Sequence, residues 1–215
     1  IQSLGRVALS WRASGRRLGL APREEAFLIY LAYQGVPLAR GQLCAFFWPD
    51  EATARARGNL RKLLADVRKS MGEALASDRE QVWLREQPYW FDVLEFQRLT
   101  QVVTHNSTHS QPIAETEIAR LSEGIRLYHG DFLANFKAPQ SQRFTAWLEQ
   151  EQRIWQLRAT ETLTLLIDHA ILSAQLAKAT AYARRLLMID RYHEGAHGHL
   201  MRLFAHQNQL ADALA

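Results

Sequence analysis

A strongly basic segment lies between residues 52 and 70 of the chain. It contains six Lys or Arg residues and a single acid, Asp66. Residues 1–100 hold 15 basic against 11 acidic side chains and residues 101–215 hold 11 of each, so the net charge of +4 belongs entirely to the first half. A local excess of cations is the pattern expected of a surface that binds a polyanion. A solvated helix face without a partner is the alternative interpretation.

A second pattern that could carry out chemistry is the sequence His193-Glu194-Gly195-Ala196-His197, which fits the H-E-x-x-H motif of zinc hydrolases. On a helix the two histidines would share one face, and the glutamate would serve as the base. However, no third ligand is evident, Gly195 weakens a helix, and the match falls where a repeat helix is expected to begin. A zinc hydrolase is therefore a remote alternative, and we expect no catalytic residue, no metal ligand and no cofactor.

The basic segment itself has the spacing of a helix, expected over residues 53–71. Leucine, valine and methionine side chains recur there at i, i+3, i+4 and i+7, which predicts one apolar stripe that packs on the protein. Polar side chains that suit phosphate oxygens and purine edges lie mainly off that stripe. They are Arg55, Arg57, Asn59, Arg61, Lys62 and Lys69.

The residues on either side of this helix are expected to hold it rigidly. Alternation over residues 4–20 predicts a β-hairpin. Pro22 and Gly35 bound a first helix, and residues 38–47 indicate a second, with Cys44 in the core. Two extended runs predict a hairpin over residues 81–93, with Arg85 at its tip. A strand pair, three helices and a hairpin form the order of a winged helix, whose third helix enters the major groove of DNA.

From residue 94 onward the pattern is helical almost throughout, with helices expected over residues 94–103, 113–129 and 139–172. The sequence QLAKATA at 175–181 recurs as QLADALA at 209–215, with five of seven positions identical at an offset of 34 residues. This is the period of tetratricopeptide helix pairs. Chance similarity between alanine-rich helices is the alternative.

These patterns together predict a mainly α fold with a small β part. An N-terminal winged helix-turn-helix is expected over residues 1–93, followed over residues 94–215 by an all-α, tetratricopeptide-like domain. The chain begins at Ile1 and ends at Ala215 within an expected helix, so we expect a piece of a longer protein. The hydrophobic share of 47% supports packed cores, and a single cysteine without a secretion signal suits the reducing cytoplasm.

The order and spacing of several short motifs resemble the Streptomyces antibiotic regulatory protein family and related activators with a bacterial transcriptional activator domain. In the first half they are PRE at 22–24, RGQL at 40–43, FWP at 47–49, ARGNLRKLL at 56–64 and VRKSMG at 67–72. In the helical half they are YHGDFL at 128–133, WLE at 147–149 and EGAHGHLMRL at 194–203. The resemblance covers nearly the whole chain.

This resemblance implies an OmpR-type winged helix that binds direct repeats in promoter DNA, joined to a helical domain that helps to recruit RNA polymerase. It implies sequence-specific binding of double-stranded DNA and transcription activation. It implies no enzymatic activity and no association with a membrane. The DNA-binding residues carried over by position are Arg55, Arg57, Asn59, Arg61, Lys62, Asp66, Lys69 and Arg85. Arg61 and Asn59 are the candidates for base edges, and Arg55, Lys62 and Lys69 for phosphates.

Two further questions stay open at the level of sequence. A tetratricopeptide-type interaction module whose winged helix contacts protein is the main alternative function, and self-association of the chain is compatible with head-to-tail binding on direct repeats. A salt series separates DNA binding from protein binding, because neutralising phosphates releases counterions.

Overall fold

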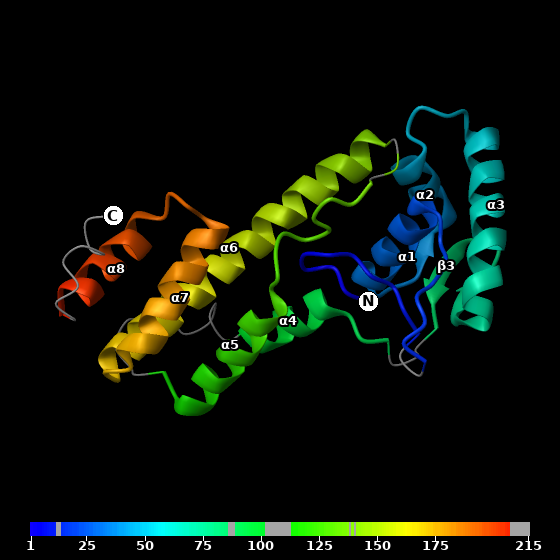
Figure 1. The fold of residues 1–215 in the computed structure, drawn as a ribbon. Coiled ribbons are helices and arrows are strands. Elements are labelled where there is room, and N and C mark those ends of the chain that lie inside the picture. The colour runs from blue at the N-terminus through cyan, green and yellow to red at the C-terminus, as the bar shows by residue number, and fades with distance from the viewer. Residues whose placement is uncertain (12–13, 86–88, 102–112, 138, 140, 207–215) are drawn as a thin grey trace. The chain divides into compact units, whose positions relative to one another are not determined.

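The computed structural model describes residues 1–11, 14–85, 89–101, 113–137, 139 and 141–206. It divides into two compact units (Figure 1). The first comprises Ile1–Leu94 and Phe132–Gln152, and the second comprises Glu95–Asp131 and Arg153–Ala215. The fold is mainly helical with a small sheet, as the sequence predicts.

The first unit contains three helices and a three-stranded sheet in the order expected of a winged helix. Helix α1 spans Pro22–Gln34, α2 spans Arg40–Phe47 and α3 spans Thr53–Met71. A 3₁₀ turn η1 at Gly72–Ala74 follows α3. The antiparallel sheet has the order β1-β3-β2, with β1 at Leu38–Ala39, β2 at Leu75–Ser77 and β3 at Gln81–Leu84.

The limits of α1 follow from local chemistry. Pro22 occupies its first turn, where the missing N–H costs nothing, and the Glu24 carboxylate accepts the N–H of Ala21 at 2.9 Å. At the other end Gly35 adopts the left-handed conformation with φ of 64° and donates its N–H to the carbonyl oxygen of Leu31. The expected bounds of this helix are therefore confirmed.

Three sequence predictions in the first unit need correction. Residues 4–20 do not form continuous strands among the described residues, because pairing is limited to isolated bridges such as Ser10 with Arg17. The second helix begins at Arg40, since Leu38 and Ala39 pair with β3 instead. The third correction concerns the hairpin expected over residues 81–93.

Strand β3 pairs with β1 and β2, and the described residues 89–91 form no strand. Asp92 begins the next helix because its carboxylate is already engaged: it accepts N–H groups from Ser3, Leu4 and Val93 at 2.7–2.9 Å. Asp92 thus anchors the N-terminal segment and is the first residue of α4, so the expected strand to Val93 is replaced by the start of a helix. The expected tip residues 86–88 lie outside the described residues.

An aromatic cluster forms the core of the first unit, and residues 132–152 contribute to it. Phe144 and Trp147 from the beginning of helix α6 (Gln142–Leu172) pack against rings of α1 and α2. Trp147 meets Tyr30 edge-on at 5.1 Å between ring centroids, and Phe144 lies 5.9 Å from Phe47. The first turns of α6 thus belong to the same core as the winged helix.

The second unit is helical. It contains most of α4 (Asp92–Thr100), α5 (Glu115–Leu127), the remainder of α6, α7 (Leu176–Ile189) and α8 (Glu194–His206). Gly124 of α5 allows a close approach to α4, because an added Cβ would lie 3.0 Å from Thr100 Cγ2. Helices α7 and α8 pack as a pair, as the repeat pattern predicts, while the second copy of the repeat at 209–215 lies outside the described residues.

Candidate nucleic-acid interface

Helix α3 has two chemically opposite faces. Its apolar stripe is buried against α1, α2, η1 and β2, and the predicted leucine and valine positions all belong to it. The buried residues are Ala56, Leu60, Leu63, Leu64 and Val67. The helix ends at Gly72, whose φ of 56° lies in the left-handed region that other residues avoid. Within the first unit, α3 therefore turns one fixed face outward (Figure 1).

Small residues run along the middle of that outward face, and cations flank them. At 100° per residue, Ala54, Gly58 and Ala65 fall within about 40° of one another. Ala54 and Ala65 are exposed, and a Cβ added to Gly58 would meet no atom within 4 Å. One side of this line carries Arg57, Arg61 and Arg68, and the other carries Arg55, Lys62 and Lys69, all six of them exposed.

The six cations differ in what they already bind. Arg55 Nε lies 2.9 Å from the carboxylate of Glu51, and Lys69 Nζ lies 2.6 Å from the carboxylate of Asp66. Within the part of the chain that the structure describes, Arg57, Arg61 and Lys62 make no ion pair or side-chain hydrogen bond. These three side chains are the ones available to an external anion without loss of an internal contact.

Arg68 is held by the sheet. Its Nη2 donates to the hydroxyl of Ser77 at 2.5 Å, and the same hydroxyl accepts from Arg40 Nη2 at 3.1 Å. Arg40 also donates to the carbonyl oxygen of Asp78 at 3.0 Å. Arg68 thus pairs within the first unit and shares its partner with Arg40.

Two of the predicted site residues lie at the edge of the buried stripe. Asn59 is half-buried because its neighbours on the helix surface, at i−3 and i+4, are the buried Ala56 and Leu63. Asp66 is also half-buried, and its hydrogen bond from Lys69 holds the pKa of its carboxyl below the usual range. The carboxylate is thus charged at neutral pH and opposes an anionic partner.

Arg85 follows β3 and is exposed. Its Nη1 lies 3.4 Å from the carboxylate of Glu73 in η1, and its backbone N–H donates to the carbonyl oxygen of Ala74. The backbone contact fixes the end of β3 beside the end of α3, so Arg85 belongs to the same unit as the cationic helix. A long, exposed ion pair of this kind contributes little to stability.

The two histidines of the H-E-x-x-H motif have structural roles. His193 lies before α8, where its Nδ1 accepts the N–H of Ala196 at 3.1 Å, and His197 Nε2 lies 3.0 Å from the carbonyl oxygen of Arg191. The two rings thus do not share one helical face as the zinc interpretation requires. No group of three or more potential ligand residues that could hold a metal ion occurs in the described ranges.

Comparisons with known proteins agree with the sequence resemblance. Residues 91–215 match the family described as bacterial transcriptional activator domain. The structure of Mycobacterium tuberculosis EmbR in complex with a low affinity phosphopeptide is similar in fold, with a TM-score of 0.70 and 18% sequence identity. That match covers 99% of this chain and 56% of the EmbR chain, so this chain spans about half of its length.

No curated protein sequence matches the chain. Among the helices that the structure describes, none combines the length and the apolar character needed to cross a membrane.

Proposed function

Since this chain belongs to the family of proteins that carry a bacterial transcriptional activator domain, we propose that it activates transcription by binding double-stranded DNA in a sequence-specific way. One observation carries the proposal: the outward face of α3 has small residues along its middle and cations along both sides. The major groove of DNA is about 12 Å wide and admits an α-helix. A helix with small central residues can lie deep in that groove while its flanking cations meet the phosphates of both strands.

The predicted cations and Asn59 then divide between base edges and phosphates. Arg61 lies near the middle of the face without an internal partner, so we assign it to a base edge, where a guanidinium binds guanine O6 and N7. Arg57 and Lys62 bind phosphates on opposite sides. Arg55 and Lys69 also meet phosphates, in exchange for their contacts with Glu51 and Asp66. Asn59 contacts DNA only at the edge of the helix, and Arg85 contacts the backbone beside η1.

The remaining parts of the proposal concern partners. Direct repeats in promoters are the expected DNA sites, and RNA polymerase is the expected protein partner of the helical unit. The cytoplasm is the expected compartment, with no enzymatic activity. We keep the functional boundary near Val93, although residues 132–152 complete the aromatic core of the first unit.

Selection of bound sequences from random duplex DNA, followed by fluorescence anisotropy with the selected duplex, tests this function. We expect Ala65→Glu to weaken binding roughly 100-fold, because it places a negative charge in the middle of the proposed interface. Ala181→Glu on the exposed side of α7 is the matched control and should bind as the unmodified chain does. Failure to enrich any sequence, or equal binding by both variants, would exclude α3 as the DNA-binding element.

A further inference from the structure

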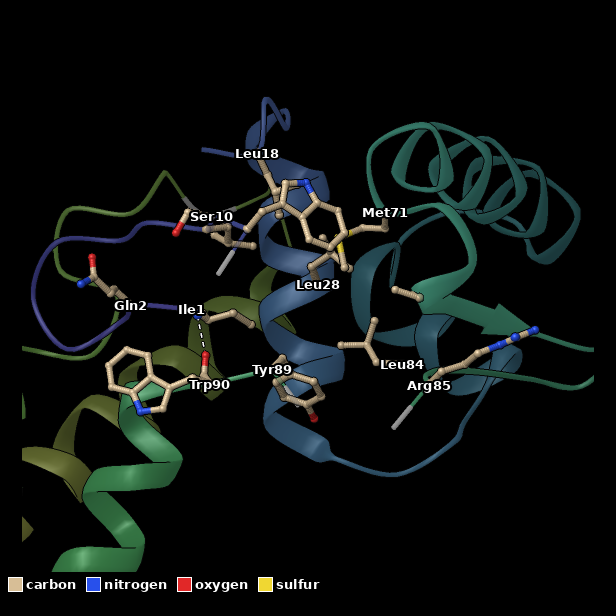
Figure 2. A pocket seen from close by; sticks show the side chains of 13 residues that line it. Ile1, Gln2, Ser10, Leu18, Leu28, Met71, Leu84, Arg85, Tyr89 and Trp90 are labelled. Atoms are coloured by element: carbon tan, nitrogen blue, oxygen red, sulfur yellow. Dashed lines mark hydrogen bonds between the residues drawn. The ribbon is translucent and has the colours of Figure 1, made fainter. Parts of the chain in front are cut away.

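The first unit contains a cavity of about 770 Å³ that the proposed DNA contact does not use. It lies between the N-terminal segment, α1, the end of α3 and the end of β3. Figure 2 shows Leu28, Met71, Leu84 and Tyr89 arranged around this space. The volume falls within the range of roughly 300–1,000 Å³ that is usual for small-molecule sites.

Large aromatic side chains line the same cavity and remain partly exposed. Trp11, Tyr89 and Trp90 leave 37%, 38% and 39% of their surface in solvent. Exposed apolar area costs free energy, at roughly 25 cal/mol per Å², and this cost is recovered when a ligand covers it. Three such rings at one cavity are a feature of a binding site, whereas isolated exposed apolar residues are ordinary.

The charges around the cavity limit the class of ligand. Two charged groups occur among the lining residues, the guanidinium of Arg85 and the α-ammonium of Ile1. The guanidinium points away from the space (Figure 2) and lies 3.4 Å from the Glu73 carboxylate, and the ammonium donates to the carbonyl oxygen of Trp90 at 2.5 Å. The hydroxyl of Tyr89 is already engaged, since it donates to the carbonyl oxygen of Ala32 at 3.3 Å. No charged side chain is therefore directed at a ligand, and burying a charged ligand there would be costly.

We propose that this cavity binds an uncharged aromatic or aliphatic molecule of drug-like size. The ligand would stack on the rings of Trp11, Tyr89 and Trp90 and contact Leu28, Met71 and Leu84. Met71 is the last residue of α3, and Leu84 is the last residue of β3. A ligand in the cavity therefore contacts the end of α3 and changes its position. The ligand is in this way an effector of DNA binding by α3.

The effector role rests on the proposed DNA binding, because coupling needs two binding events and acts equally in both directions. Binding of the ligand to the cavity does not depend on the proposed DNA binding. The test is therefore a direct titration of the whole 215-residue chain, without DNA, so that its failure and the failure of DNA binding are separate results.

The probe is N-phenyl-1-naphthylamine, an uncharged aromatic dye whose fluorescence rises in apolar sites. We expect saturable binding of one dye per chain. Ala74 lines the cavity, so Ala74→Phe should fill part of it and weaken dye binding at least tenfold. The matched control Ala181→Phe adds the same ring to the exposed side of α7 and should leave the affinity at the cavity unchanged.

A second measurement covers the case in which Ala74→Phe does not fold. Energy transfer from tryptophan to the bound dye should fall by more than half in the Trp11→Phe/Trp90→Phe variant, which keeps aromatic rings and removes the nearest donors. Exposed apolar side chains of the second unit, Leu172 and Met188, are the competing dye site. Unchanged energy transfer in the double variant, or loss of dye binding in Leu172→Gln/Met188→Gln, would overturn the proposal.

Discussion

On α3, Arg57 and Arg61 make no ion pair or side-chain hydrogen bond in the described residues. In the second unit Arg185 has the opposite environment. Its Nη2 donates to the carbonyl oxygens of Ile125 and Tyr128 at 2.5 and 2.7 Å, at the end of α5. The Tyr128 carbonyl lies at the C-terminal end of α5, where carbonyls lack the usual helical donor, while the Ile125 carbonyl also accepts the N–H of Tyr128 at 3.2 Å. Arg185 therefore binds carbonyls at a helix end, whereas Arg57 and Arg61 have no such partner within the described residues.

Other arginines of the second unit follow the pattern of Arg185. Arg120 donates to the carbonyl oxygen of Arg98, and Arg98 is paired with Glu95. Arg158 lies over the ring of Trp155 at 5.5 Å. The comparison teaches that the net charge of a segment does not identify a binding surface. The identifying property is a group of exposed cations on one helix face, several of which make no ion pair or side-chain hydrogen bond in the described residues.

The largest expected effect is on stability, from Arg185→Ala. This change removes the Arg185 donor from the Tyr128 carbonyl and one of two donors from the Ile125 carbonyl, so we expect the free energy of unfolding to fall by about 2–3 kcal/mol. DNA affinity at a temperature where the variant is folded should stay within twofold. Urea denaturation and anisotropy measure the two quantities.

The neighbouring Arg184 provides the control for that prediction. It is exposed, its guanidinium carbon lies 5.6 Å from the centroid of the Phe204 ring, and it donates to no carbonyl among the described residues. Arg184→Ala should therefore cost no more than about 1 kcal/mol. If both changes lowered the free energy of unfolding equally, the carbonyl contacts of Arg185 would not be the cause of its effect on stability.

The next effect is on binding, from Arg61→Ala. We expect a loss of about 1–3 kcal/mol in DNA affinity and a relaxed sequence preference at one base pair, because a bidentate contact to guanine is removed. The free energy of unfolding should change by less than about 0.5 kcal/mol, as is usual for an exposed side chain. Competition with single-base variants of the selected duplex measures the preference.

A matched arginine outside α3 tests whether that loss is specific. Arg126 of α5 is exposed, and in the part of the chain that the structure describes it makes no ion pair or side-chain hydrogen bond like those of Arg185. Arg126→Ala removes the same charge, so it should leave DNA affinity within twofold. If it weakened binding as much as Arg61→Ala, the effect would come from net charge and not from the surface of α3.

The smallest expected effect comes from Asp66→Asn. Removing this carboxylate frees Lys69 and takes away a repulsion from phosphate, so affinity should rise about two- to fivefold. The Lys69 hydrogen bond lowers the pKa of Asp66, so the carboxylate stays charged as the pH falls from 8 to 5.5. The gain should therefore be equal at both pH values. A gain confined to pH 8 would contradict this account of the carboxylate.

The helices were predictable because their signals are local. The apolar spacing of Leu60 to Met71 and the cap at Gly72 set α3 at residues 53–71 before any contact was known. The hairpin over residues 81–93 was not predictable, because Asp92 is fixed by groups near residue 3 that lie far away in sequence. Likewise, no periodicity indicates that Phe144 and Trp147 pack on rings of α1 and α2.

The sequence predicted which face of α3 is exposed, but it did not predict the environment of each side chain on that face. Helical spacing placed Arg61 and Lys62 outward, and the structure agrees. The same spacing did not show that Asn59 is half-buried or that Arg68 donates to Ser77. Such distinctions depend on which neighbour lies within hydrogen-bond reach, and a sequence does not contain that information.

The salt dependence of DNA binding tests the central claim most directly. Anisotropy titrations of the selected duplex at several salt concentrations would compare the unmodified chain with Arg57→Ala/Arg61→Ala/Lys62→Ala. If these three cations face phosphates and bases, the slope of log K against log salt should decrease by about 2–3, because each lost phosphate contact releases about one counterion fewer. An unchanged slope in a folded triple variant would contradict the assignment of the outward face of α3 to DNA.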